Sequence, residues 1–282
     1  MIHLAYDGSI NGDWVAWYAL NLARHDADKR LRVIHVDSGE VDAATVREKM
    51  EEFTRDCERA GVAMEHVSVP CAGASAASVF KALVKAVPAG PDTLLVCGAR
   101  LKEGAGGYLA GTVSEKLLSD RTFPVMAVRV AQPGLLGAPT RFLMPVAGDR
   151  DGFLTGAHIL KRFGPGVARV HLLRVMQLKR LWFRRLENHQ AERLREKGWA
   201  MMRGLGDDLA ALVGIDAAKT DVHVTVSDDW AQDVIIAAGR HKTHLILMEA
   251  ARHDLGVGYL YGNAIEVVLR NAPCDVAIYR GL

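Results

Sequence analysis

An internal repeat constrains the fold of this 282-residue chain more than any other feature. The segment Gly107-Tyr108-Leu109-Ala110-Gly111 returns 151 residues later as Gly258-Tyr259-Leu260-Tyr261-Gly262. The same offset aligns four further pairs: Glu115 with Glu266, Leu118 with Leu269, Val125 with Val276, and Arg129 with Arg280. Because one gapless register explains all of these matches, the sequence predicts two copies of one module.

A short segment between the two copies has the composition of a linker. Residues 131–140 contain two prolines and two glycines, which disfavour a continued helix or strand. We therefore expect one domain over residues 1–132 and a second over residues 141–282.

Strand-like and helical patterns alternate along each copy. In the first half, strands are expected at Ile2–Tyr6, Leu31–Val36, Ala63–Val69, Thr93–Cys97 and Val125–Val128. Helices are expected between them, near Asp13–Arg24, Ala43–Ala60, Ser75–Ala86 and Thr112–Ser119. In the second half, strands are expected near Phe142–Val146, Ala168–Val175, Asp221–Val226, Leu245–Met248 and Val276–Tyr279, with a long helix over about Leu186–Leu212. Such alternation predicts an α/β fold, with an open, doubly wound, mainly parallel five-stranded sheet in each half.

Composition excludes several classes of protein. The chain has 35 Lys and Arg against 33 Asp and Glu, a formal charge of +2, which argues against a disordered chain and against a broadly basic nucleic-acid binder. No apolar run approaches the roughly 20 residues of a membrane span, and the first residues lack the basic region of a signal peptide, so we expect a cytoplasmic protein. The cysteines form no CxxC pair and are expected to be buried, reduced thiols: Cys57, Cys71, Cys97 and Cys274.

A glycine-rich segment after the fourth strand of the first half is the best candidate for a ligand site. In open α/β sheets, ligands bind beyond the carboxyl ends of the strands. Glycines between Gly98 and Gly111 would let the backbone approach a phosphate, and a helix is expected to begin at Thr112. Backbone N–H groups of Gly111, Thr112 and Val113, with the charge of Arg100, would suit a polyphosphate.

The spacing within this segment resembles that of the universal stress protein family. Nucleotide-binding members carry a glycine, two residues, a second glycine, nine residues, a third glycine and then Ser or Thr. Gly98, Gly111 and Thr112 fit this pattern, whereas Leu101 stands at the second glycine and would crowd the phosphate path. The resemblance covers both halves, so the chain is similar to tandem universal stress proteins and their adenine nucleotide alpha hydrolase-like fold.

The resemblance implies a set of nucleotide-binding residues in the first half. An aspartate after the first strand holds adenosine in the family, which matches Asp7, and the adenine-side position matches Val36. The implied ligand is ATP, with Mg²⁺ as its accompanying ion. The candidate binding residues are Asp7, Val36, Gly98, Arg100, Gly111, Thr112 and Val113.

The second half departs further from the family pattern. Its equivalents are Glu249, Arg252, Gly262 and Asn263, with Ala147 in place of the aspartate. One glycine of three survives, and a carboxylate at Glu249 would repel phosphates. We expect that this half does not bind ATP in the same way; it would serve as a packing partner or bind another ligand through Arg252 and His253.

Histidines near the fourth strand of the second half are a weaker candidate site. His241, His244, His253 and Glu249 could suggest a metal, but they lack the spacing of a helix-face ligand pair, and surface or capping roles are favoured. No metal ligand is therefore assigned.

Aromatic residues at helical spacing, Trp14, Trp17 and Tyr18, are expected to pack against the sheet and not to stack on a base.

The motifs predict binding and regulation more than catalysis. Neither a G-x-S-x-G elbow nor a Walker-type loop is present, so no catalytic residue is assigned and at most slow ATP hydrolysis is expected. The resemblance implies a regulatory or sensory role in the stress response, a protein partner not identified by the sequence, and association through last strands. Val125–Val128 and Val276–Tyr279 would then pair as an intramolecular pseudo-dimer, and the chain could also form a homo-oligomer.

Two other function classes stay open at this point. One is a nucleotide-independent interaction scaffold, favoured by Leu101, Ala147 and Glu249. The other is an adenylate-handling enzyme of similar topology, which is disfavoured because Asp7-Gly8-Ser9-Ile10-Asn11-Gly12 lacks a serine-glycine-glycine pyrophosphate loop.

Overall fold

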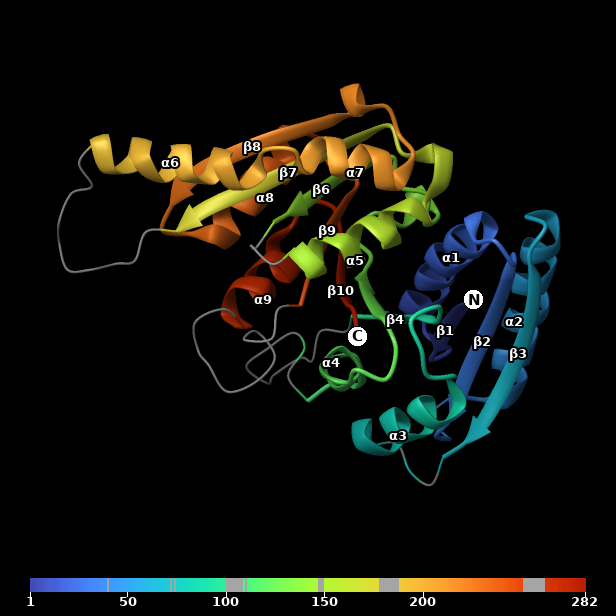
Figure 1. Cartoon of the computed structure of the whole chain (residues 1–282). Coiled ribbons are helices and arrows are strands. Elements are labelled where there is room, and N and C mark those ends of the chain that lie inside the picture. The colour runs from blue at the N-terminus through green and yellow to red at the C-terminus, as the bar shows by residue number, and fades with distance from the viewer. Residues whose placement is uncertain are drawn as a thin grey trace. The chain divides into compact units, whose positions relative to one another are not determined.

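A computed structural model describes residues 1–39, 41–71, 73, 75–99, 109, 111–146, 150–177, 188–250 and 262–282 (Figure 1). The chain forms two compact units. The first comprises Met1–Ala138 together with Ala277–Leu282, and the second comprises Pro139–Val276. Within the described residues, no helix combines the length and hydropathy needed to cross a membrane.

Strands and helices of the first unit alternate in the predicted order. Its elements are β1 (Ile2–Tyr6), α1 (Ile10–His25), β2 (Arg30–Asp37), α2 (Ala43–Arg59), β3 (Ala63–Pro70), α3 (Ala76–Ala86), β4 (Leu94–Gly98), α4 (Val113–Ser119) and β5 (Val125–Arg129). The strands lie in the order β3-β2-β1-β4-β5, and each neighbouring pair is parallel. The predicted α/β class is confirmed.

The order of these strands creates a crevice at the carboxyl end of β1. The chain moves outward from β1 to β2 and β3, then returns to the other side of β1 to form β4. Connections therefore diverge between β1 and β4, the point at which ligands bind in open sheets. Asp7 follows β1 and Gly98 ends β4, so the topology brings these two predicted site residues to the same edge.

The central strands are buried because their sequences are apolar on both faces. Ile2 and Leu4 of β1, and Leu95 and Val96 of β4, have no exposed surface. Near-continuous apolar runs of this kind are typical of parallel strands covered by helices on both sides. The sheet therefore forms the core, and polar residues gather in the loops beyond the strand ends.

The second unit repeats this topology. Its elements are β6 (Arg141–Pro145), α5 (Arg150–Lys161), β7 (Arg169–Gln177), α6 (Asn188–Met202), α7 (Leu205–Val213), β8 (Thr220–Ser227), α8 (Trp230–Arg240), β9 (Leu245–Glu249), α9 (Gly262–Asn271) and the start of β10 (Asp275–Arg280). The order β9-β6-β7-β8 is parallel at each pairing and matches the order in the first unit.

The prediction of one long helix over about Leu186–Leu212 is wrong. Among the described residues, α6 ends at Met202 and α7 begins at Leu205. Gly204 between them has a φ of +79°, a left-handed conformation that interrupts an α-helix and that glycine adopts without steric cost.

The two units divide between Ala138 and Pro139, inside the predicted linker. A 3-10 turn at Pro133–Leu135 begins this segment. The last residues, Ala277–Leu282, belong to the first unit although the sequence assigns them to the second domain. They form most of β10, which follows β5 in the strand order. The pseudo-dimer built on this strand stays a prediction.

Candidate functional site

A cavity of about 430 Å³ lies at the carboxyl ends of β1, β2 and β4 in the first unit. Its walls come from these strand ends, from α3, and from the chain that leads into α4. The lining includes six of the seven predicted binding residues: Asp7, Val36, Gly98, Gly111, Thr112 and Val113. The seventh, Arg100, and the departing residue Leu101 lie outside the described residues.

Asp7 is held in place by the turn between β1 and α1. Its Oδ1 accepts hydrogen bonds from the backbone N–H of Ser9 at 3.0 Å and from Ser9 Oγ at 2.6 Å. Ser9 is the N-cap of α1, and its Oγ accepts from the backbone N–H of Gly12. A Cβ on Gly12 would lie 2.5 Å from Asp7 Oδ1, so the glycine makes room for the carboxylate.

A second group of polar contacts fixes the same turn from outside. Tyr6 donates a hydrogen bond from its hydroxyl to Asp13. Lys49 of α2 lies 2.7 Å from Asp13 Oδ2 and donates to the carbonyl of Gly8 at 2.9 Å. Burial, followed by the hydrogen bond to Asp13, raises the pKa of Tyr6 above its usual value, so the phenol remains a neutral donor. The floor of the cavity is therefore anchored to both α1 and α2.

One side of the cavity is apolar. Val36 and Ile34 of β2 face it together with Val79 and Leu83 of α3. Nearby, the ring of the buried His35 lies with Nδ1 3.1 Å from the carbonyl oxygen of Tyr6, which joins β2 to β1 at this edge. An apolar wall of this kind suits a flat aromatic ring, and the polar Asp7 lines the same cavity.

The start of α4 is capped by its own side chains. Thr112 Oγ1 accepts from the backbone N–H of Glu115 at 3.1 Å and donates to the carbonyl of Leu109 at 2.6 Å. The carboxylate of Glu115 accepts from the backbone N–H of Gly111 at 2.6 Å. The backbone N–H of Thr112 donates to the carbonyl of Leu109 at 3.0 Å. The N–H groups predicted to bind phosphate at Gly111 and Thr112 therefore already have partners, and a phosphate that uses the Gly111 N–H must displace Glu115. The Thr112-x-x-Glu115 spacing of a capping box predicts a carboxylate beside these N–H groups, although Glu115 here accepts from Gly111, one residue before the N-cap.

The end of β9 in the second unit differs from the end of β4. Glu249 stands where the first unit has Gly98, and its carboxylate lies against Gly152 of α5. Gly262 and Asn263 begin α9. Ala147, Arg252 and His253 lie outside the described residues.

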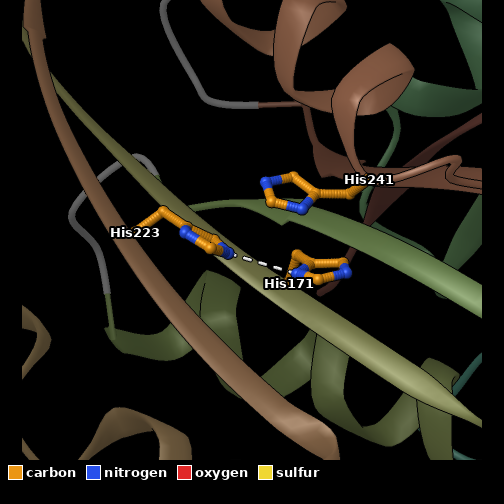
Figure 2. Close-up of side chains that lie close together, drawn as sticks. All are labelled: His171, His223 and His241. Atoms are coloured by element: carbon orange, nitrogen blue, oxygen red, sulfur yellow. Dashed lines mark hydrogen bonds between the residues drawn. The ribbon is translucent and has the colours of Figure 1, made fainter.

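Three histidines of the second unit form a cluster that the sequence did not reveal (Figure 2). His171 of β7 and His223 of β8 are joined by a hydrogen bond of 3.1 Å between Nδ1 and Nε2. His241, the C-cap of α8, stacks on His171 with ring centroids 4.1 Å apart. His241 occupies the C-cap position of α8 through its backbone N–H, and its side chain joins the cluster. His244 lies elsewhere, beside Thr140 and Arg141.

The register of β7 and β8 explains this cluster. His171 lies opposite Asp221 in the parallel pairing, and His223 is two residues further along β8, on the same face. Burial is the first cause that lowers the pKa of all three imidazoles, with the value for His171 about 4. The useful sequence signal was one histidine near the start of each of two adjacent strands.

No protein-family model matches the sequence, and no curated protein matches it. Solved structures do match the fold. A universal stress protein from Archaeoglobus fulgidus is 19% identical with a TM-score of 0.62, over 98% of this chain and 97% of that chain. The cytoplasmic domain of a prokaryotic cation chloride cotransporter is 10% identical with a TM-score of 0.58, over 99% and 95%. The chain therefore has the fold of universal stress proteins, with two copies of their α/β module in one polypeptide.

Proposed function

We propose that the first unit binds an adenine nucleotide, ATP, in the cavity beside Asp7, and that the chain is a universal stress protein with a regulatory role in the stress response. The observation that carries the proposal is the position of the motif residues. Residues as distant in sequence as Asp7, Val36 and Gly111 line one cavity at the topological switch point of the sheet.

The chemistry of the cavity walls suits the parts of a nucleotide. The apolar side formed by Val36, Val79 and Leu83 would receive the adenine ring. The carboxylate of Asp7, oriented by Ser9, would accept hydrogen bonds from ribose hydroxyls. The phosphates, accompanied by Mg²⁺, would extend toward Gly98 and Gly111, which line the same cavity.

A regulatory role fits this site better than efficient hydrolysis. The sequence contains neither a Walker-type loop nor a G-x-S-x-G elbow, and the proposed role of Asp7 is to hold the ribose. Any turnover of ATP would be slow, and the bound nucleotide would act by changing the loops that surround the cavity.

Titration calorimetry with ATP and AMP on the whole chain tests the proposal. We expect one ATP per chain, tighter binding of ATP than of AMP, and at least a ~10-fold loss of affinity in Asp7→Ala. Gly111→Val should also weaken binding, because φ at Gly111 is +75° and a Cβ there is strained. Gly262→Ala changes the equivalent glycine of the second unit and is the matched control, with affinity and stoichiometry unchanged.

A nucleotide-independent scaffold is the second candidate function. It is favoured by the hydrogen bond from Gly111 to Glu115, which places an anion where a phosphate would bind. If the wild-type chain binds neither ATP nor AMP, or if Asp7→Ala and Gly111→Val bind ATP as the wild type does, the nucleotide site is refuted and the scaffold remains.

A further inference from the structure

The histidine cluster of the second unit brings three imidazole nitrogens within reach of a single metal ion. One nitrogen from each of His171, His223 and His241 lies within 4.8 Å of the other two. In a tetrahedral site with metal–nitrogen bonds of about 2.0–2.1 Å, ligand nitrogens are about 3.3 Å apart. The 3.1 Å separation between His171 Nδ1 and His223 Nε2 is already close to that value.

We propose that His171, His223 and His241 bind a late first-row transition-metal ion, Zn²⁺, through one imidazole nitrogen each (Figure 2). His171 is buried, whereas His223 and His241 are half-exposed. The ring of His241, which is stacked on His171 with centroids 4.1 Å apart, must tilt out of this stack to aim a nitrogen at the same ion. Imidazole ligands select zinc and its neighbours over Mg²⁺ and Ca²⁺, which prefer oxygen ligands.

Metal binding replaces the hydrogen bond between two of the ligands. At present one N–H lies between His171 Nδ1 and His223 Nε2. To present both lone pairs to a cation, the ring that carries this proton must shift it to its other nitrogen. The two rings then remain neutral, and the cation occupies the place of the shared proton.

Access to the cluster and a fourth ligand come from an adjacent cavity. A pocket of about 280 Å³ is lined by His223 and His241 together with Thr225 and Asp233. An ion can reach both half-exposed histidines through this pocket. Water from the same pocket would supply the fourth ligand. Structural zinc sites have four protein ligands, whereas catalytic zinc sites have three and leave the fourth position to water.

Some charges around the cluster would attract a cation, and others would repel it. The carboxylate of Asp221 lies 3.3 Å from His171 Nδ1, but it also pairs with the guanidinium of Arg169, so these two charges largely offset each other beside the cluster. His241 ends α8, where the carbonyl end of the helix adds partial negative charge. Arg240 lines the pocket and opposes a cation, whereas Arg169 is paired with Asp221 at 2.6 and 2.7 Å.

A bound ion would connect three elements of the second unit. The ligands come from β7, from β8 at the end of the strand order, and from the end of α8. Binding to the folded state alone would stabilise this unit in proportion to the free-ion concentration. The site is independent of the proposed nucleotide site, which lies in the first unit.

Equilibrium dialysis of the whole chain against ZnCl₂, with metal analysis, measures this site directly. We expect one Zn²⁺ per chain in the wild type and at least a ~100-fold weaker affinity in His223→Gln and in His241→Gln. His158→Gln changes an exposed histidine of α5 in the same unit and should bind as the wild type does. MgCl₂ should not compete. Retained circular dichroism spectra establish that the two cluster variants are folded.

The fluorescence of Trp199 provides a second measurement of metal binding in the same pocket. Its side chain is 46% exposed and lines the pocket with His223 and His241. Paramagnetic Ni²⁺ should quench part of the tryptophan fluorescence in the wild type and in His158→Gln, but not in Trp199→Phe or His223→Gln. The proposal is overturned if the wild type fails to bind Zn²⁺ up to about 1 mM, or if His223→Gln and His158→Gln bind it equally.

Discussion

The carboxylate of Glu249 lies against the backbone of Gly152, so closely that a Cβ on Gly152 would be 1.6 Å from Glu249 Oε2. The first unit has the opposite arrangement. There Gly98 is the bare residue at the strand end, and a Cβ on it would be 2.8 Å from Asn11 Nδ2 of α1. In both units a side chain packs on a glycine where the first helix meets the fourth strand. In the first unit the glycine ends the strand and the side chain comes from the helix, whereas in the second unit the glycine is in the helix and the side chain ends the strand. This exchange gives the second unit a carboxylate at the edge where the first has an open cavity.

The contact between Glu249 and Gly152 predicts that the effect of Gly152→Ala depends on Glu249. In the wild type the added methyl must displace the carboxylate, and we expect the free energy of unfolding to fall by about 1–2 kcal/mol. In Glu249→Ala the obstacle is gone, and the better helix propensity of alanine should raise it by up to ~1 kcal/mol. Urea denaturation of the four proteins measures the coupling; equal effects of Gly152→Ala in both backgrounds would contradict it. Gly166→Ala, with no atom within 4 Å of the new Cβ, is the control.

Gly137 should tolerate no side chain. Its φ is +65°, and a Cβ would lie 2.3 Å from the backbone carbon of Trp17 in α1. Backbone cannot move aside as a flexible side chain can, so Gly137→Ala should lower the free energy of unfolding of the first unit by about 2–3 kcal/mol. Thermal denaturation of the variant and the wild type measures this loss. Gly134→Ala, a neighbour in the same segment with open space around its Cβ, should have little effect in that experiment.

Patterns local in sequence predicted the elements well, and contacts between distant residues were harder to predict. β1 begins and ends at the predicted residues because its apolar run is bounded by Asp7. The start of α1 at Ile10 was placed three residues late, because Ser9 acts as an N-cap and Gly12 lies inside the helix. The break at Gly204 depends on a left-handed φ that helical periodicity does not report.

The two candidate sites also differ in how far local sequence patterns predict them. The cavity residues follow a spaced motif within one segment and the ends of strands that are neighbours in the sheet, so topology alone brings them together. The cluster of His171, His223 and His241 depends on the register between β7 and β8, over a separation of 52 residues for its first pair. In the sequence His241 stands close to His244, and no local pattern connects it to His171 or His223.

Burial should protect most of the thiols in the first unit. Burial raises the pKa of Cys57 and of Cys97, each to about 12, so neither forms thiolate near neutral pH. Cys71, after β3, is half-exposed. Mass spectrometry after brief maleimide treatment at pH 7 should find Cys71 modified first, with Cys57 and Cys97 reacting only after denaturation. Early modification of Cys97, which lines the cavity of the first unit, would show that the cavity opens more than the structure indicates.

His3 should make the first unit less stable in mild acid. The residue is 1% exposed, and neither ring nitrogen has a hydrogen-bond partner among the described residues. Burial, with the charge of Arg32, lowers the pKa of His3 to about 4, below its ordinary 6.5. Between these values the unfolded chain binds a proton that the folded chain does not. The free energy of unfolding therefore falls as pH decreases from 6.5 to 4, by up to ~3 kcal/mol.

Replacing this histidine separates its contribution from that of other groups. His3→Leu should flatten the decline between pH 6.5 and 4, and near pH 7.5 it should keep or raise stability because two buried polar atoms are removed. Urea denaturation across this pH range measures both effects. His25→Gln, a histidine of α1 in the same unit, should retain the slope of the wild type; an unchanged slope in His3→Leu would show that other groups cause the acid sensitivity.

Arg240 should limit the affinity of the histidine cluster for a cation. Its guanidinium lines the same pocket as His223 and His241 and repels a divalent ion, whereas Arg169 is neutralised by its pair with Asp221. Arg240→Gln should therefore tighten Zn²⁺ binding several-fold, with a larger gain at low ionic strength because salt screens exposed charges. Lys161→Gln, a change of equal charge on α5, should leave the affinity unchanged in the same dialysis experiment. Equal affinities in Arg240→Gln and the wild type at low salt would mean that the guanidinium turns away from the ion, and the pocket would then admit cations without an electrostatic barrier.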